Sequence, residues 1–247
     1  GFSRFLPFKP PYDQPEYIAF GGIVNSTQSV LEGDCWSDVK GSDKSFRIGV
    51  NYDDLRNNRS QWEEETMPMS RVGGLSVTLP NGELLLLNGA EQGMGNDYLH
   101  NPVRTAVMYD PDAPVGNRYR TVASSPIKRL YHNVAMLLPN GNVMIAGGEQ
   151  GEAYSTANDG PWCGTNYDYT YEAEMYKPPY VFEPEKRPTI TQLENGYPVG
   201  DDDDNVGFEF GDTIRVYYTT TPESSADVVV DGATITSPSA VTHGTEM

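Results

Sequence analysis

Tyr131 and His132 are the residues of this 247-residue chain whose types and position best fit a chemical role. A phenol and an imidazole can together bind a transition metal or transfer a proton. The pair precedes a predicted strand, at a point where an internal repeat of the sequence contains one extra residue. The two side chains could also be an ordinary tyrosine and histidine packed at the edge of a sheet, and the residue pattern leaves both interpretations open.

The sequence around the other two histidines gives less indication of a chemical role. His100 lies in a segment that reads as a loop, and His243 follows a turn-rich segment typical of a surface histidine. The sequence lacks the Gly-x-Ser-x-Gly motif, the zinc-peptidase and Cys-x-x-Cys patterns, and a glycine-rich phosphate loop. These absences disfavour nucleophilic hydrolysis, zinc catalysis and phosphate binding.

Cys35 and Cys163 are the only cysteines, so they can form at most one disulfide bond. Asn25 and Asn58 begin Asn-x-Ser/Thr triplets, which accept N-linked glycans in secreted proteins. Because such triplets also arise by chance, they add little by themselves to the case for secretion. The sequence contains no signal peptide and starts at Gly1 without a methionine, so we expect the true N-terminus to lie elsewhere.

Composition and charge narrow the class of protein. The chain contains 25 glycines, 19 prolines and 16 tyrosines, which favours short strands and many turns over helices. Its net charge of −18 disfavours nucleic acid as a partner, because phosphate binding needs a basic face. No apolar stretch reaches about 18 residues, so we expect no membrane span. The acidic run 201–204 reads as a solvated loop, since no EF-hand spacing surrounds it.

Residues 71–93 and 129–151 are two copies of one unit, in which Leu-Pro-Asn-Gly joins two strands and glycine follows the second strand. The first strand alternates apolar residues with others, as expected for one buried face, whereas the second is almost continuously apolar. Asn-Gly predicts a tight type I′ hairpin between them. Pro80 and Pro139 are 59 residues apart (139 − 80), a spacing of the size of a propeller blade with its loops.

The two copies differ in length ahead of the first strand. Arg71 precedes Pro80 by nine residues, whereas Arg129 precedes Pro139 by ten. One extra residue at the start of a strand is the signature of a β-bulge, which can turn neighbouring side chains to one side. A degraded copy at residues 17–22 keeps the inner strand and a glycine pair, and we expect its hairpin partner to lie before Gly1.

Composition changes after about residue 180, where strands without a repeat partner are predicted from residue 186, over 212–218 and over 227–235. An Asp-Gly hairpin signal lies within the last of these segments. Short strands of this kind resemble the opening of a β-sandwich, although they are too few to complete one. The predicted organisation is therefore all-β, with one domain over residues 1–182 and the start of another over 183–247.

Several segments together resemble the copper-radical oxidases, most nearly glyoxal oxidase and more distantly galactose oxidase. The strongest is Arg-Leu-Tyr-His-Asn-Val-Ala-Met-Leu-Leu-Pro-Asn-Gly at residues 129–141. Further matches are residues 107–114, Glu-Met-Tyr-Lys-Pro-Pro-Tyr at 174–180, 187–190 and Ser-Pro-Ser-Ala-Val-Thr-His at 237–243, with a weaker match over 6–22. They follow the order of the family over most of the chain, which is more specific than any single motif.

The resemblance implies a Kelch-type β-propeller, partial here, followed by an Ig-like β-sandwich whose loop reaches the propeller axis. It implies one copper ion, with Tyr131 as a tyrosine ligand and catalytic base and with His132 and His243 as imidazole ligands. It also implies a radical tyrosine cross-linked to cysteine. That cysteine and tyrosine belong to early blades of the family, upstream of this chain, and neither Cys35 nor Cys163 matches their motif.

The implied function is part of a secreted copper-radical oxidase that oxidises small aldehydes or primary alcohols with O2 and yields hydrogen peroxide. The alternative is a non-catalytic extracellular module of the same architecture, used for adhesion or matrix assembly, because a fold can outlast its chemistry. About three blades are too few to close a propeller. We therefore expect the remainder of the same chain, or another chain, to complete it.

Overall fold

A computed structural model describes most of the chain. The described residues are 1–24, 39–57, 59–93, 99–149, 153–154, 164–165, 169–194, 197–199, 202–207, 211–220, 235, 239–241 and 245–246. Strands dominate them, beside the short helix α2 (Tyr52–Arg56) and the 3-10 helices η2 (Pro179–Phe182) and η3 (Pro184–Lys186). The prediction of an all-β protein is confirmed. The chain divides into two compact units, Gly1–Tyr176 with Thr234–Met247, and Lys177–Ala233.

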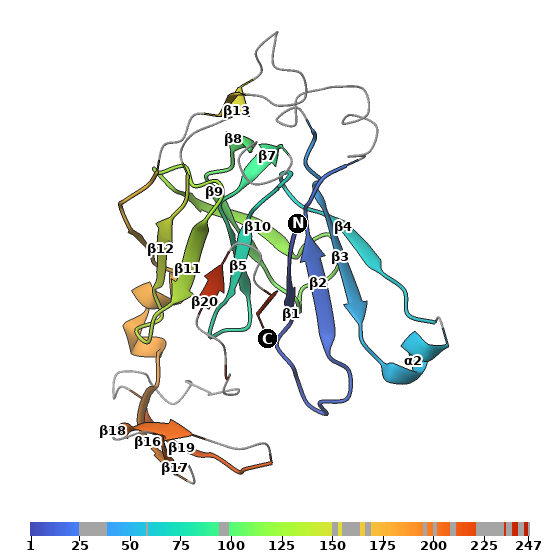
Figure 1. Cartoon of the computed structure of the whole chain (residues 1–247). Coiled ribbons are helices and arrows are strands. Elements are labelled where there is room, and N and C mark those ends of the chain that lie inside the picture. Colours follow the sequence, from blue (N-terminus) through green and yellow to red (C-terminus); the bar gives the residue numbers. More distant parts are fainter. Residues whose placement is uncertain are drawn as a thin grey trace. The chain divides into compact units, whose positions relative to one another are not determined.

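The first sheet of the larger unit is an antiparallel meander with one added strand (Figure 1). Its strands in chain order are β1 (Phe2–Phe5), β2 (Glu16–Phe20), β3 (Lys44–Gly49) and β4 (Glu63–Thr66), with β21 (Thr245–Glu246) parallel to β1. The expectation that the partner of residues 17–22 lies before Gly1 is wrong, because β1 pairs with β2. Residues 6–15 connect them without Leu-Pro-Asn-Gly, so the repeat pattern does not reveal β1.

The two copies of the repeat form the first hairpins of the second and third sheets. The second sheet contains β5 (Leu75–Thr78), β6 (Leu84–Leu87), β9 (Thr105–Tyr109) and β10 (Tyr119–Ser124), in that spatial order. The third contains β11 (Asn133–Leu137), β12 (Val143–Gly147) and β15 (Glu174–Tyr176), with β20 (Ser239–Val241) on the other side of β11. Smaller pairs are β7 (Ala90–Gln92) with β8 (His100–Pro102), and β13 (Ala153–Tyr154) with β14 (Gly164–Thr165).

Both Leu-Pro-Asn-Gly hairpins differ from the predicted type I′ turn. The Gly82 N–H donates to the Leu79 carbonyl at 2.9 Å, and Gly82 has a φ of +84°, whereas Asn81 is not among the residues with positive φ. The second hairpin repeats this arrangement, with Gly141 at a φ of +84°. Proline is restricted to a φ near −65°, which suits the second position of a type I turn, and glycine then occupies the bulge that follows.

The apolar core of the larger unit lies between the first and second sheets. All four residues of β6 are buried, which confirms the prediction of a strand covered on both faces. The cluster comprises Leu6, Ile18, Phe20, Met67, Leu84, Leu86, Val107 and Tyr109. Full burial of a leucine side chain stabilises the fold by about 1.5–3 kcal/mol. Within this unit β5 lies between β1 and β11 (Figure 1), so strands of the three sheets contact one another directly.

The described strands of the smaller unit form two two-stranded sheets. β16 (Thr189–Glu194) pairs with β19 (Arg215–Thr219), and β17 (Tyr197–Val199) pairs with β18 (Asp202–Gly207). These strands confirm two of the predicted segments, while 227–235 lies outside the described residues except for Ile235. The acidic run predicted as a loop instead begins β18, because Asp202 pairs with Val199. The domain boundary predicted between residues 182 and 183 stays a prediction.

None of the described helices is long and apolar enough to cross a membrane.

Candidate functional site

The predicted β-bulge lies directly before β11. In the first copy of the repeat, Val72 and Ala90 exchange two backbone hydrogen bonds of 2.7 and 2.9 Å. In the second copy, the Glu149 carbonyl accepts from the Leu130 N–H at 2.8 Å, while the Glu149 N–H donates to the Tyr131 carbonyl at 3.0 Å. Two residues thus oppose one, which confirms the bulge and locates the extra residue.

His132 occupies a backbone conformation that usually favours glycine. Its φ is +58°, and the strand registers align it with Gly73 of the first copy, whose φ is +65°. A residue with a side chain is strained there, although histidine enters this region more readily than most residues. Strained backbone of this kind is concentrated at active sites and ligand-binding sites.

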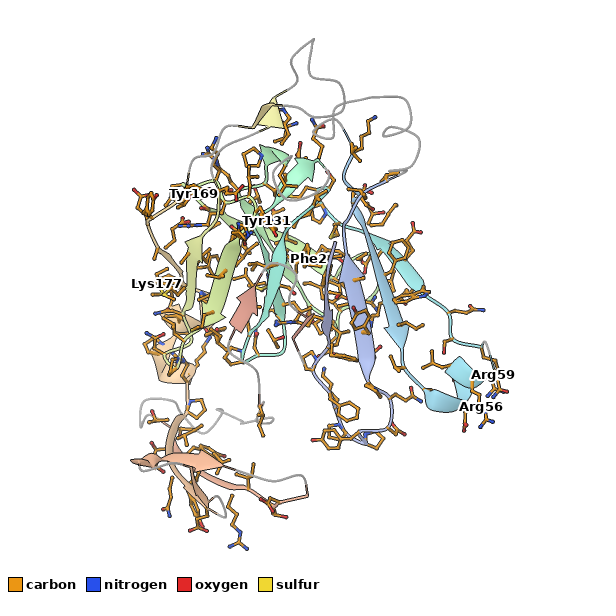
Figure 2. The ribbon with its side chains drawn as sticks, viewed as in Figure 1. Phe2, Arg56, Arg59, Tyr131, Tyr169 and Lys177 are labelled. Carbon is orange, nitrogen blue, oxygen red and sulfur yellow. The ribbon has the colours of Figure 1, made fainter. Side chains whose placement is uncertain are left out.

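The bulge and the left-handed residue bring two neighbouring rings together. The ring centroids of Tyr131 and His132 are 3.8 Å apart, with an angle of 41° between the ring planes. On a regular strand, adjacent side chains would point to opposite faces. The rings therefore lie side by side at the end of the third sheet where β11 begins, the position at which Figure 2 labels Tyr131.

Each ring has its own support. Tyr131 is half buried and packs against an apolar cluster of Val72, Ala90, Leu99 and Leu130. The Nδ1 atom of His132 lies 3.1 Å from Oε1 of Glu149, and the Glu149 side chain is 8% exposed whereas that of His132 is 66% exposed. An imidazole that donates its Nδ1–H to a carboxylate keeps the Nε2 lone pair for a metal ion.

Two buried polar side chains, Arg129 and Asn133, hold the backbone on either side of Tyr131 and His132. Arg129, whose side chain is fully buried, donates to the carbonyls of Gly147 at 2.6 Å and Glu172 at 2.8 Å, and to Glu174 Oε2 at 2.9 Å. Asn133, also fully buried, donates to the Leu130 carbonyl and accepts from Asn88 Nδ2 at 2.9 Å. The chain on either side of Tyr131 and His132 is therefore held by hydrogen bonds.

The C-terminal strand runs toward the same end of β11. β20 pairs antiparallel with β11, with Ser239 opposite Met136 and Val241 opposite Val134. Val241 precedes His243 by two residues, just as His132 precedes Val134 by two. His243 itself lies outside the described residues, as do Cys35, Cys163, Asn25 and Asn58.

The described part of the chain holds two of the three side chains that the family resemblance assigns to the metal, Tyr131 and His132. It contains no group of three His, Cys, Asp or Glu side chains that converge to hold a metal ion. A phenol and an imidazole side by side nevertheless suit Cu(II), which favours tetragonal sites with such donors. His100 does not join them: it was predicted to lie in a loop, but it begins β8 and pairs with Gln92.

Glu149 was missed by the sequence analysis. Alignment of the two copies places it where the first copy has Ala90, so a charged residue replaces a small apolar one beside the extra residue. That difference was the available signal.

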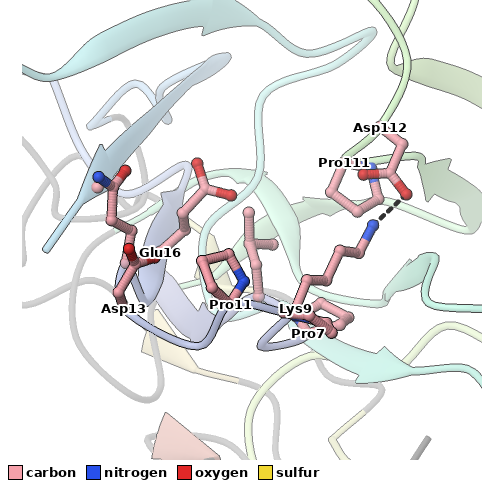
Figure 3. Close-up of a pocket in the computed structure, with 11 residues that line it drawn as sticks. Pro7, Lys9, Pro11, Asp13, Glu16, Pro111 and Asp112 are labelled. Atoms are coloured by element: carbon pink, nitrogen blue, oxygen red, sulfur yellow. Dashed lines mark hydrogen bonds and ion pairs between the residues drawn. The ribbon is translucent and has the colours of Figure 1, made fainter. Parts of the chain in front are cut away.

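A separate cavity of about 330 Å³ lies beside the connection from β1 to β2 (Figure 3). Prolines and carboxylates line it, including Pro7, Pro11, Asp13 and Glu16, and an ion pair joins Lys9 to Asp112 across it. Neither Tyr131 nor His132 borders this cavity. It shares no residue with the candidate site.

Comparison with known proteins gives one consistent result. Residues 1–180 match the family described as glyoxal oxidase N-terminus. Aldehyde oxidase GLOX1 of Arabidopsis thaliana is 38% identical over 121 residues, covering 49% of this chain and 18% of that protein. Aldehyde oxidase GLOX of Vitis pseudoreticulata is 33% identical over 189 residues, covering 74% of this chain and 32% of that protein.

A fungal alcohol oxidase of the AA5 family, solved in complex with copper, has a similar fold, with a TM-score of 0.54 at 19% identity. The match covers 78% of this chain and 35% of that chain. The chain thus spans 35% or less of the length of each of these relatives. With the family match over residues 1–180, the resemblance is confirmed: the chain belongs to the glyoxal oxidase N-terminus family of copper-radical oxidases.

Proposed function

We propose that this chain is part of a secreted copper-radical oxidase that oxidises small aldehydes or primary alcohols with O2. Tyr131, His132 and His243 would bind the copper ion. The observation that carries the proposal is the bulge before β11, which gives Tyr131 and His132 a shared direction. A structural turn would not need a histidine at the left-handed position where the first copy uses glycine.

The proposed architecture extends the observed sheets. The three main sheets of the larger unit would be blades of a Kelch-type propeller, completed by the remainder of the same chain or by another chain. The smaller unit would belong to an Ig-like sandwich. The pairing of β20 with β11 supports this architecture, because it returns the C-terminal segment to the end of β11 next to the candidate site.

The proposed roles of Tyr131 and His132 follow from the side chains that each of them contacts. Tyr131 would accept the proton of the substrate hydroxyl, with its ring packed against apolar side chains. His132 would hold the metal through Nε2 while Glu149 holds Nδ1. Copper would supply one-electron chemistry. The substrate loses two electrons and two protons, and O2 gains both to become hydrogen peroxide.

The test uses the full-length protein. We expect about one copper per chain and release of peroxide from methylglyoxal or a similar small aldehyde, with both lost in His132→Ala and His243→Ala. Copper content is measured by elemental analysis and peroxide by a coupled peroxidase assay. Unchanged copper uptake in both variants would refute the site. Copper uptake without peroxide from any small aldehyde or primary alcohol would instead favour the non-catalytic module.

A further inference from the structure

We propose that Glu149 is a positioning residue that fixes the ring orientation and tautomer of His132 for metal binding. The metal part of this inference rests on the proposed function. The hydrogen bond between Glu149 and the imidazole is a contact within the chain, so that part of the inference does not depend on the proposed function. The Nδ1 and Oε1 atoms are 3.1 Å apart.

Glu149 is attached to the turn that it positions. Its N–H donates to the Tyr131 carbonyl and its own carbonyl accepts from Leu130, so its backbone closes the bulge from the opposite strand. Its side chain then returns to the ring of His132. The backbone and the side chain of Glu149 therefore both bind residues 130–132. A shift of the His132 ring relative to the strand would strain the backbone hydrogen bonds and the contact with the carboxylate.

The difference in burial between the two side chains indicates which one orients the other. The His132 side chain is 66% exposed and contacts the ring of its neighbour Tyr131, whereas the Glu149 side chain is 8% exposed. A buried carboxylate needs hydrogen-bond donors, and exposed surface ion pairs are weak by comparison. The buried partner is thus the fixed one, and the exposed ring takes its orientation from it.

The first copy of the repeat provides an internal comparison. It has Gly73 at the left-handed position and Ala90 opposite, so both the histidine and its carboxylate are missing there. The left-handed conformation persists without them, whereas the bulge is found only in the second copy. Neither residue is required for the turn itself, which points to a joint role in orienting the imidazole.

The chemical consequence concerns the neutral imidazole, which carries a proton on only one nitrogen. Donation of Nδ1–H to Glu149 leaves Nε2 as the acceptor that faces away from the carboxylate. Without Glu149 both tautomers and both ring orientations become available, and only part of the population is ready to bind. Loss of such a carboxylate partner typically costs about 10–100-fold in metal affinity.

The experiment compares Glu149→Ala, Glu149→Gln and the control Glu83→Gln in the full-length protein. Glu83 forms its ion pair with Arg120 and makes no contact with His132, so it controls for the loss of one carboxylate. We expect Glu149→Ala to raise the Kd for Cu(II) about 10–100-fold and to alter the Cu(II) electron paramagnetic resonance spectrum. Glu149→Gln should retain most of the affinity because its amide oxygen still accepts from Nδ1–H, and Glu83→Gln should match the unmodified protein.

A second readout uses the metal-free protein. The ¹⁵N chemical shifts of the His132 ring, at a pH where the imidazole is neutral, report which nitrogen carries the proton. We expect the Nδ1–H form in the unmodified protein and in Glu149→Gln, and a mixture in Glu149→Ala. If Glu149→Ala is poorly folded by circular dichroism, Glu149→Gln and a Glu149→Leu variant of similar volume decide the same question.

The outcomes separate the two proposals. If His132→Ala loses copper while every Glu149 variant binds it within about twofold and keeps the tautomer, the positioning role is wrong and the proposed function stands. If His132→Ala binds copper normally, the proposed function fails, and the metal-free tautomer alone decides whether Glu149 orients the ring.

Discussion

The first copy of the repeat carries Gly73 and Ala90 where the second carries His132 and Glu149. Both copies share the Pro-containing turn, the left-handed position and the close glycine after the second strand, but only the second has the bulge at Leu130 and Tyr131. The hairpin therefore folds without the site residues. Relative to the first copy, the candidate site adds a bulged residue, a histidine and a carboxylate to the same hairpin.

The two buried arginines of the repeat extend this comparison. Arg71 donates to the carbonyls of Asn88 and Thr105, and Arg129 donates to those of Gly147 and Glu172. Only Arg129 has a carboxylate partner, Glu174. Burial lowers the pKa of Arg71 to about 10. Both arginines therefore donate to backbone carbonyls, but only the arginine of the second copy also forms an ion pair.

The largest expected effect tests that difference. Arg129→Met removes the cation of the partly buried Glu174 together with two hydrogen bonds to carbonyls, and should lower the free energy of unfolding by about 3 kcal/mol or more. Arg71→Met removes hydrogen bonds to two carbonyls and to the Met69 sulfur but no ion pair, and should cost about 1–3 kcal/mol. Urea unfolding of the full-length protein measures both. Equal losses would show that the ion pair adds nothing, and a double variant with Glu174→Met should recover part of the loss.

A smaller effect tests the left-handed position. Gly73→Ala combines an unfavourable φ of +65° with a Cβ that would lie 2.9 Å from Leu99 Cδ1, so we expect a loss above about 1–2 kcal/mol. Gly116→Ala is the matched control, because its φ is +87° and nothing lies within 4 Å of the added Cβ. Thermal unfolding separates strain from contact. If Gly116→Ala costs as much as Gly73→Ala, the contact with Leu99 is unimportant.

The smallest effect concerns the hairpin turns. Glu83 aligns with Asn142 of the second copy, so only the first hairpin carries a titratable group at this position. Burial raises the pKa of Glu83, but hydrogen bonds from Arg120 and Asn81 and the charge of Arg120 outweigh it, and the net pKa lies below its ordinary 4.5.

A lowered folded-state pKa stabilises the protein above the unfolded value, and that stability is lost as the pH falls through the folded value. Glu83→Gln should therefore cost less than about 1 kcal/mol at pH 7, and the difference should vanish in acid. Unfolding midpoints measured from pH 7 to pH 2 provide the test. A constant difference across this range would mean that the pairing is not electrostatic.

Much of the fold was predictable because it depends on local patterns. Alternation, the repeated turn and the glycine pairs located β5, β6, β11 and β12. The bulge was predictable from a single extra residue. β1 was missed because its connection to β2 carries no turn motif, and the turn type was wrong because Pro80 determines the conformation more strongly than Asn-Gly.

The candidate site was predictable only in part. Residue type and position identified Tyr131 and His132, and the family resemblance identified His243. The contact between His132 and Glu149 joins two strands across a hairpin, and no pattern within one strand reveals it. Comparison of the two copies position by position would have identified Glu149, because sites within a repeat stand out where the copies differ.

The pairing of β20 with β11 has a consequence for timing during synthesis. A ribosome makes β11 long before residues 239–241, and N-terminal parts of a chain generally begin to fold first. One edge of β11 therefore has no partner strand until β20 leaves the ribosome. A nascent chain interrupted before that segment would have folded hairpins and an unpaired edge, which is open to strand pairing with other chains.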